Sequence, residues 1–172
     1  MKKVILSLVV VAIASLSASA QKEKAESKDL KFSVGVEAGL PIGDFKSGYS
    51  FGIGGSVQGE YAVAETVGIT LNAGYLSFTG KTITEGGQSL KLPSTSMIPV
   101  LAGAKFHFTE KIYGHAQLGL SFFNNGGGSA FTYSPGIGFD LAENFDILIK
   151  YQAASKSGST LSFIGLRAAY TF

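Results

Sequence analysis

Strict alternation of apolar residues with polar or small ones is the feature that most constrains how this chain can fold. It runs through eight segments, and one face of every segment carries no charged, amide, serine or threonine side chain. Alternation with a period of two is typical of a β-strand whose two faces meet different surroundings. The sequence therefore predicts an all-β fold of eight antiparallel strands. The segments are 31–40, 50–63, 67–78, 96–108, 112–122, 131–141, 145–154 and 161–172.

Two kinds of eight-stranded barrel produce such alternation. A soluble lipocalin-like barrel turns its apolar face inward around a ligand, whereas a membrane barrel turns that face outward to lipid. Aromatic residues lie near both ends of the apolar segments, as in two interfacial girdles, and the opposite face is rich in glycine with few charges. The segments also reach the roughly 9–11 residues that a tilted strand needs to cross hydrocarbon. These features favour an up-and-down transmembrane β-barrel.

Short and long connections alternate along the chain. The short ones, 64–66, 109–111 and 142–144, each have a glutamate at the centre. In bacterial barrels tight turns face the periplasm and longer loops face the exterior. We therefore expect both ends of the barrel chain in the periplasm. The connections expected outside the cell are 41–49, 79–95, 123–130 and 155–160.

The first thirty residues differ from the rest. Residues 1–20 have the layout of a cleaved secretory signal peptide, with two lysines, an apolar stretch, and small residues before Gln21. Residues 21–30 are charged and lack periodicity, which predicts a periplasmic lead-in. The barrel domain then occupies residues 31–172.

Composition excludes several classes of function. Without the two lysines of the leader, positive and negative side chains balance, so the chain offers no basic surface for nucleic acid. The absence of cysteine excludes disulfides, thiol catalysis and cysteine metal sites. We expect no cofactor.

The leader, the strands, the short turns and the terminal Phe172 resemble the small eight-stranded outer-membrane barrels related to OmpA-type and OmpX-type proteins. The resemblance covers residues 31–172. The ending from Leu166 to Phe172 is similar to the C-terminal signal read by the barrel-assembly machinery, with Arg167 where that signal usually has glycine. The resemblance implies the outer membrane of a Gram-negative-type bacterium, with membrane lipids around the barrel. It also implies the barrel-assembly machinery and periplasmic chaperones as partners during biogenesis.

Charged side chains on the inward face form the candidate site. Extending the short turns as hairpins places Asp140 opposite Asp146 and Lys105 opposite His115, while barrel closure places Glu37 opposite Arg167. A four-residue loop between the last two strands would also bring Arg167 beside Asp146. We therefore predict Arg167 as the centre of a buried network with Glu37 and Asp146, because a guanidinium fork suits two carboxylates. A network that fills the lumen is favoured over a gate or proton path. Its expected members are Glu37, Lys105, Asp140, Asp146, Lys150 and Arg167.

Histidine offers little support for catalysis. His107 and His115 would need carboxylate help to bind a metal, because cysteine is absent. A lipid-modifying enzyme would need a histidine, a serine and a carboxylate together at the outer rim. Both histidines are expected to face inward, and His107 adjoins a short turn, so neither arrangement is indicated. Pro99 cannot donate to a strand ladder and predicts a bulge or local break.

The favoured function is therefore a non-enzymatic outer-membrane barrel with a structural or surface-interaction role, its longer loops presented outside. Eight strands leave a lumen just wide enough for side chains, which disfavours a general diffusion pore. Two alternatives stay open, namely a narrow channel or small-molecule transport barrel that uses the polar lumen, and an outer-membrane lipid-modifying enzyme. No particular extracellular ligand is indicated.

Overall fold

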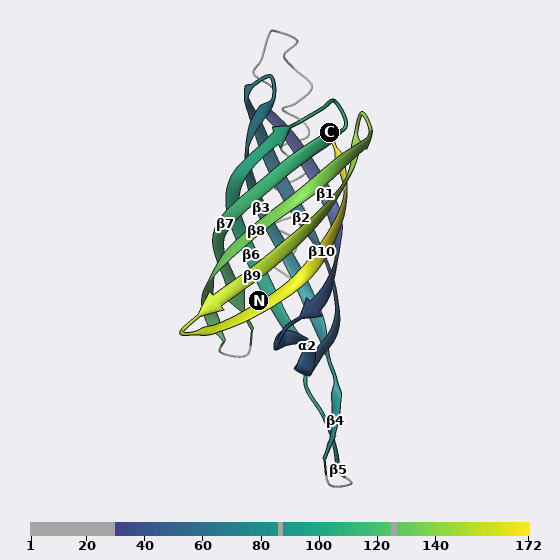
Figure 1. The fold of residues 1–172 in the computed structure, drawn as a ribbon, viewed down its shortest axis with the longest axis vertical. Coiled ribbons are helices and arrows are strands. Elements are labelled where there is room, and N and C mark those ends of the chain that lie inside the picture. The colour runs from purple at the N-terminus through teal and green to yellow at the C-terminus, as the bar shows by residue number, and fades with distance from the viewer. Residues whose placement is uncertain (1–29, 86–87, 125–126) are drawn as a thin grey trace, which may run out of the picture.

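Eight long strands close into an antiparallel barrel in this computed structural model, which describes residues 30–85, 88–124 and 127–172 (Figure 1). Their order around the barrel is β1-β10-β9-β8-β7-β6-β3-β2. This confirms the predicted fold class, and the strand limits lie close to the predicted ones. The strands are β1 (Leu30–Ile42), β2 (Tyr49–Ala64), β3 (Val67–Gly80), β6 (Thr95–His107), β7 (Ile112–Phe123), β8 (Gly128–Ala142), β9 (Phe145–Lys156) and β10 (Ser159–Thr171).

The predicted signal peptide and most of the lead-in lie outside the described residues. Among the residues that are described, no helix has both the length and the apolar character needed to cross a membrane.

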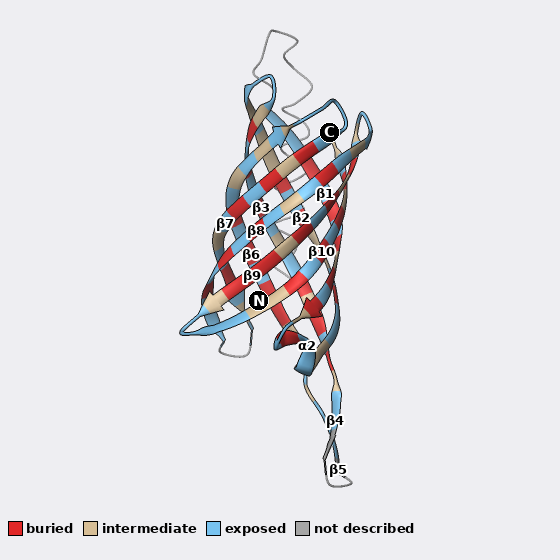
Figure 2. Cartoon of the chain, viewed as in Figure 1, coloured by how far each residue is buried: buried red, intermediate tan, exposed pale blue. Residues whose placement is uncertain are grey.

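The apolar face of the strands points outward. Buried and exposed residues alternate along every long strand (Figure 2), and large apolar side chains stand on the outer wall, with Val36 68% and Ile53 64% exposed. The polar face is the buried one and includes Glu37 and Arg167, each 2% exposed. A lipocalin-like barrel has the reverse arrangement, so the outer wall is built for hydrocarbon.

The short turns set the strand register as predicted. Asp140 pairs with Asp146, and Lys105 pairs with His115. The β2–β3 and β8–β9 ladders each have a register shift beside the turn, and beyond it inward residues stay opposite inward residues. We call the end of the barrel that carries these turns the turn end and the opposite end the hairpin end.

The predicted connection between the last two strands is wrong. Strands β9 and β10 are joined by a turn of two residues, Ser157 and Gly158, with φ angles of 49° and 86°. Positive φ at both positions is the two-residue hairpin geometry that matches the right-handed strand twist, and glycine adopts it without cost. The tighter turn pairs Arg167 with Leu148, so Arg167 is not directly opposite Asp146.

Two longer connections contain structure that the sequence did not reveal. A single helical turn, α2 (Phe45–Gly48), lies between β1 and β2. Strands β4 (Thr82–Glu85) and β5 (Gln88–Lys91) pair with each other as a separate hairpin between β3 and β6. This outer hairpin projects from the barrel at the end away from the C-terminus (Figure 1).

Pro99 produces a local break and no bulge. The ladder between β3 and β6 runs to Ala73 opposite Val100 and resumes at Leu76 opposite Met97 in the same register. Proline has no backbone N–H to donate, so the pairing is interrupted beside it while the strand continues.

Candidate functional site in the lumen and at the hairpin end

A buried ion pair in the middle of the lumen links β9 and β1, the two strands on either side of β10. Lys150 of β9 reaches across β10 to Glu37 of β1, and its Nζ lies 2.7 Å from Glu37 Oε2. The two side chains are 4% and 1% exposed. Lys150 crosses β10 at Gly165, where an added Cβ would lie 3.0 Å from Lys150 Cγ. The glycine therefore keeps the path of the lysine side chain open.

Arg167 bonds hydroxyl groups, which differs from the predicted arrangement. Its Nε donates to Ser56 Oγ and its Nη2 to Ser33 Oγ, both at 2.9 Å. Arg167 is opposite Glu37 in the register, as predicted. In the described part of the chain it forms no ion pair. Glu37 is paired with Lys150, and the register set by the tight β9–β10 turn places Leu148, and not Asp146, opposite Arg167. Arg167 is therefore buried in the lumen without bridging the two carboxylates.

The paired aspartates at the turn end are each compensated by a different group. Tyr113 donates from its hydroxyl to Asp146 Oδ2 at 2.5 Å. Asp140 lies 3.8 Å from Lys105 Nζ and 3.2 Å from His107 Nε2. Like charges directly opposite on a sheet are unfavourable, and this separation of partners relieves that repulsion.

Lys105 lies between the group around Asp140 and the Tyr113–Asp146 pair. Its Nζ lies 4.0 Å from the centre of the Tyr113 ring and 3.6 Å from Glu60 Oε2. Tyr113 reaches Asp146 by lying over Gly138 of β8, where any Cβ would overlap the tyrosine ring. The predicted residues thus fall into two groups, Glu37 with Lys150 at mid-lumen and Lys105 with Asp140 at the turn end, while Asp146 and Arg167 bond neutral partners.

The second histidine belongs to a group of hydrogen-bonded polar side chains. His115 Nε2 lies 3.1 Å from Thr70 Oγ1, and Gln117 Nε2 donates to Thr70 Oγ1 at 3.2 Å and to Gln58 Oε1 at 3.3 Å. Both histidines point into the lumen and not to the lipid-facing wall. Within the described residues, no three His, Asp or Glu side chains are grouped so as to hold a metal ion.

An aromatic cluster closes the lumen at the hairpin end. Phe45 of α2 packs on Phe78 of β3 with ring centres 4.9 Å apart, and Phe78 packs on Phe163 of β10 at 5.1 Å. All three are at most 3% exposed, and Leu76 and Met97 complete the cluster. We call these five residues the aromatic stopper.

The stopper is not predicted by the sequence pattern. That pattern indicates a polar and small inward face, although Phe78 and Phe163 occupy inward phases of their strands. Their large side chains at those phases were the available signal. Phe45 gave none, because it lies in a connection that was expected to be a loop.

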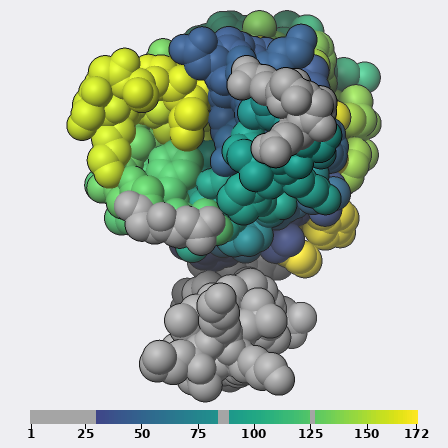
Figure 3. Space-filling model, turned by 90° about the horizontal axis from the view of Figure 1, so that it is seen from below, coloured from purple at the N-terminus to yellow at the C-terminus, as the bar shows by residue number. Residues whose placement is uncertain are grey.

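The outer hairpin extends beyond the stopper. Ile83 and Leu90 are paired across it and remain 41% and 69% exposed. At its base, Lys81 donates from Nζ to the backbone oxygen of Lys46 on α2 at 2.6 Å. The space-filling view of the hairpin end shows α2 (blue), the outer hairpin (teal) and the β9–β10 turn (yellow) together on this face of the molecule (Figure 3).

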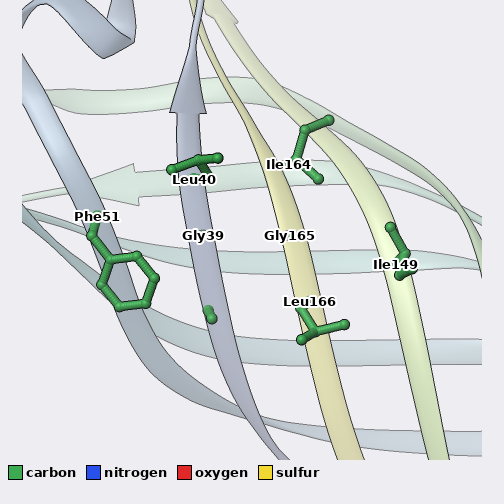
Figure 4. A pocket seen from close by; sticks show the side chains of 8 residues that line it. Gly39, Leu40, Phe51, Ile149, Ile164, Gly165 and Leu166 are labelled. Carbon is green, nitrogen blue, oxygen red and sulfur yellow. The ribbon is translucent and has the colours of Figure 1, made fainter.

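An apolar groove lies on the lipid-facing wall and not in the lumen. It has a volume of about 280 Å³ and crosses the seam between β1 and β10 (Figure 4). Ala38 is the small outward residue that leaves this hollow among larger neighbours. The groove offers no polar group for catalysis. Its outward side chains include Leu40, Phe51, Ile149, Ile164 and Leu166.

Comparisons with known proteins agree with this architecture. The family model described as "Outer membrane protein beta-barrel domain" matches residues 8–172. A search of curated proteins found no match.

Similar solved structures include three bacterial barrels. Ail, the attachment invasion locus protein of Yersinia pestis, in complex with the heparin analogue sucrose octasulfate, is 18% identical with a TM-score of 0.58, covering 84% of this chain and 99% of that one. The N-terminal β-barrel domain of Pseudomonas aeruginosa OprF is 14% identical with a TM-score of 0.55, covering 83% and 97%. Neisserial surface protein A is 11% identical with a TM-score of 0.51, covering 83% and 95%. At these identities the likeness shows a shared fold.

Proposed function

This chain belongs to the outer membrane protein β-barrel domain family, and from that premise we propose that it is a sealed, non-enzymatic barrel that presents its outer hairpin to a partner outside the cell. It is an integral barrel of the outer membrane of a Gram-negative bacterium. The observation that carries the proposal is the aromatic stopper, which fills the lumen directly beneath the exposed hairpin.

The lumen contents support a sealed barrel over a narrow channel. A solute would have to displace the aromatic stopper and then pass the Glu37–Lys150 ion pair and the Tyr113–Asp146 contact. A barrel of eight strands leaves space for little besides its own side chains. These three obstructions lie one after another along the barrel axis. Displacing the side chains of one of them would leave the other two in place.

We expect no stepwise conductance from the purified protein in planar lipid bilayers, because the stopper and the ion pair both obstruct the lumen. The same preparation should be shown to be folded and inserted by its resistance to protease in vesicles. Regular conductance steps that disappear in Lys105→Gln, Lys150→Gln or Arg167→Gln would instead favour the channel.

Three observations support a non-enzymatic role. His115 is hydrogen-bonded to Thr70 and His107 to Asp140, and both histidines lie inside the lumen. A lipid substrate approaches from the outer wall, where the groove is lined by apolar side chains. Hydrolysis or acyl transfer on purified lipid that is abolished by His107→Ala or His115→Ala would overturn this part of the proposal.

The outer hairpin is the proposed contact surface. It combines two paired, exposed apolar residues with lysines at its base. Exposed apolar residues rimmed by polar ones are typical of protein-binding surfaces. The relative Ail is named for attachment and was solved with a heparin analogue, which is in keeping with a surface role for this chain.

Deleting residues 82–91 and joining the ends with a short Gly-Ser linker should abolish binding of intact cells to host matrix and glycan surfaces while the barrel stays folded. The reason is that the hairpin packs outside the closed barrel ladder. Binding is measured by adhesion of cells that express each variant at equal levels. A matched control replaces Ser157 by Asn in the β9–β10 turn, which keeps the two-residue geometry. Unchanged adhesion after the hairpin deletion contradicts the proposal.

The proposed orientation places the outer hairpin outside and the turn end in the periplasm. Since the chain contains no cysteine, single cysteines report position cleanly. In intact cells, Leu90→Cys on the hairpin should react with a membrane-impermeant maleimide, whereas Glu110→Cys in a short turn should react only after the outer membrane is permeabilised. The reverse pattern contradicts the orientation. Both positions are exposed, so burial does not confound the comparison.

A further inference from the structure

Within the described residues, three buried side chains of the lumen have polar atoms without a hydrogen-bond partner, namely Glu37, Ser134 and Gln152. Glu37 is compensated by its ion pair with Lys150, which leaves Gln152 and Ser134 without a partner in the protein. Gln152 of β9 is 0% exposed, and neither its Nε2 nor its Oε1 is bonded. Ser134 of β8 is 2% exposed, and its Oγ is likewise unbonded. Buried polar atoms are nearly always paired with protein or with ordered water, because an unpaired one forfeits its hydration.

The two side chains lie on the same stretch of lumen wall. The ladder between β8 and β9 pairs Tyr133 with Ala153 and Gly136 with Lys150, and continuing this register places Ser134 opposite Gln152. Backbone pairing is absent at that position, next to Pro135, which cannot donate an N–H. Gln152 is also opposite Phe163 of the aromatic stopper. Gln152 therefore lies beside the stopper, on the strand that also carries Lys150.

We propose that Gln152 and Ser134 form an internal binding site for ordered water beside the aromatic stopper. The set of unbonded atoms decides the ligand class. Gln152 Oε1 needs a donor, Gln152 Nε2 needs an acceptor, and the Ser134 hydroxyl can serve as either. Chloride only accepts and a metal cation offers no proton, so each leaves part of the set unbonded. Water donates and accepts, and it adds no charge beside the Glu37–Lys150 pair.

Other lumen groups at comparable burial serve as internal controls. Ser121 and Thr132, both 0% exposed, bond each other through their hydroxyls at 2.7 Å. Gln117, 5% exposed, donates its amide to Gln58 and Thr70. These groups already have protein partners, so the same physical argument assigns them no water. Gln152 and Gln117 can therefore be compared as two buried amides. Gln152 has no hydrogen-bond partner in the protein, and Gln117 has two.

The test uses the full-length mature barrel in lipid nanodiscs, with nitrogen-15 label in glutamine side chains. We expect the Gln152 amide protons to show magnetisation transfer from water that is at least severalfold stronger than at Gln117. The Gln152 signals are assigned by their loss in Gln152→Leu, or by their loss in Gln152→Glu if the leucine variant does not fold. Transfer at Gln152 no stronger than at Gln117 overturns the proposal.

A second measurement separates water from an anion. A crystal of the protein grown in bromide should show density within hydrogen-bond distance of Gln152 and Ser134 without an anomalous signal. Anomalous bromide at that position, or absence of any density there, would refute the water site.

The stability of Gln152→Leu provides a third measurement. Replacing a dry, unbonded amide should raise the urea midpoint, whereas replacing a hydrated one should leave it unchanged or lower it.

Discussion

Replacing Lys150 by methionine should lower the free energy of unfolding by about 3–5 kcal/mol, because it leaves Glu37 as an uncompensated charge in the lumen. The pair is almost fully buried, with Nζ 2.7 Å from Oε2 and side chains 4% and 1% exposed, so solvent screens it little. Methionine fills a similar volume and follows the same path over Gly165, which isolates the loss of charge from the loss of packing. Urea unfolding from lipid vesicles measures the change.

Two controls make this expectation specific to the ion pair. Lys156→Met removes an exposed lysine whose Nζ bonds the backbone oxygen of Gly127, and it should cost less than about 1 kcal/mol. The double variant Glu37→Gln with Lys150→Met removes both charges and should recover much of the stability lost in the single variant. If single and double variants unfold at the same urea concentration, the ion pair does not carry the effect.

Pairings near the turn end followed from the sequence because those turns have fixed length. A three-residue turn leaves one register that keeps the apolar face continuous, so Asp140 opposite Asp146 could be derived without a structure. Barrel closure gave Glu37 opposite Arg167 by the same reasoning. At the hairpin end, the positive φ of Ser157 shortens the connection to two residues, and a serine gives little warning of that conformation.

Side-chain partners were harder to derive than the register. A long side chain in a barrel can bond a residue two strands away if the strand between presents glycine. Lys150 crosses Gly165, and Arg167 crosses Gly35, where an added Cβ would lie 2.9 Å from its Nε. Pairwise strand registers do not encode these diagonal paths. The charged pair at mid-lumen is therefore Glu37–Lys150, in place of the predicted network centred on Arg167.

The aromatic stopper supplies the other large expected effect. Phe78→Ala should lower the free energy of unfolding by about 3–5 kcal/mol, since truncating a buried phenylalanine leaves a cavity that the surrounding barrel cannot close. Phe78 is 1% exposed and packs between Phe45 and Phe163. Its ring also lies over Gly52, whose missing side chain makes room for it. The barrel wall is held by strand pairing and cannot move inward to fill the space.

Phe51→Ala is the matched control, because it removes the same side chain from the outer wall. Phe51 is 47% exposed, and lipid chains can occupy the space that its ring vacates, so no dry cavity forms. Its cost should therefore be clearly smaller than that of Phe78→Ala when both are unfolded by urea from the same vesicles. Equal losses would mean that the rings act through general apolar content and that the stopper has no special packing role. A large loss confined to Phe78 would show that the hairpin end of the lumen is a packed core, which is the condition for a barrel that displays its loops without conducting.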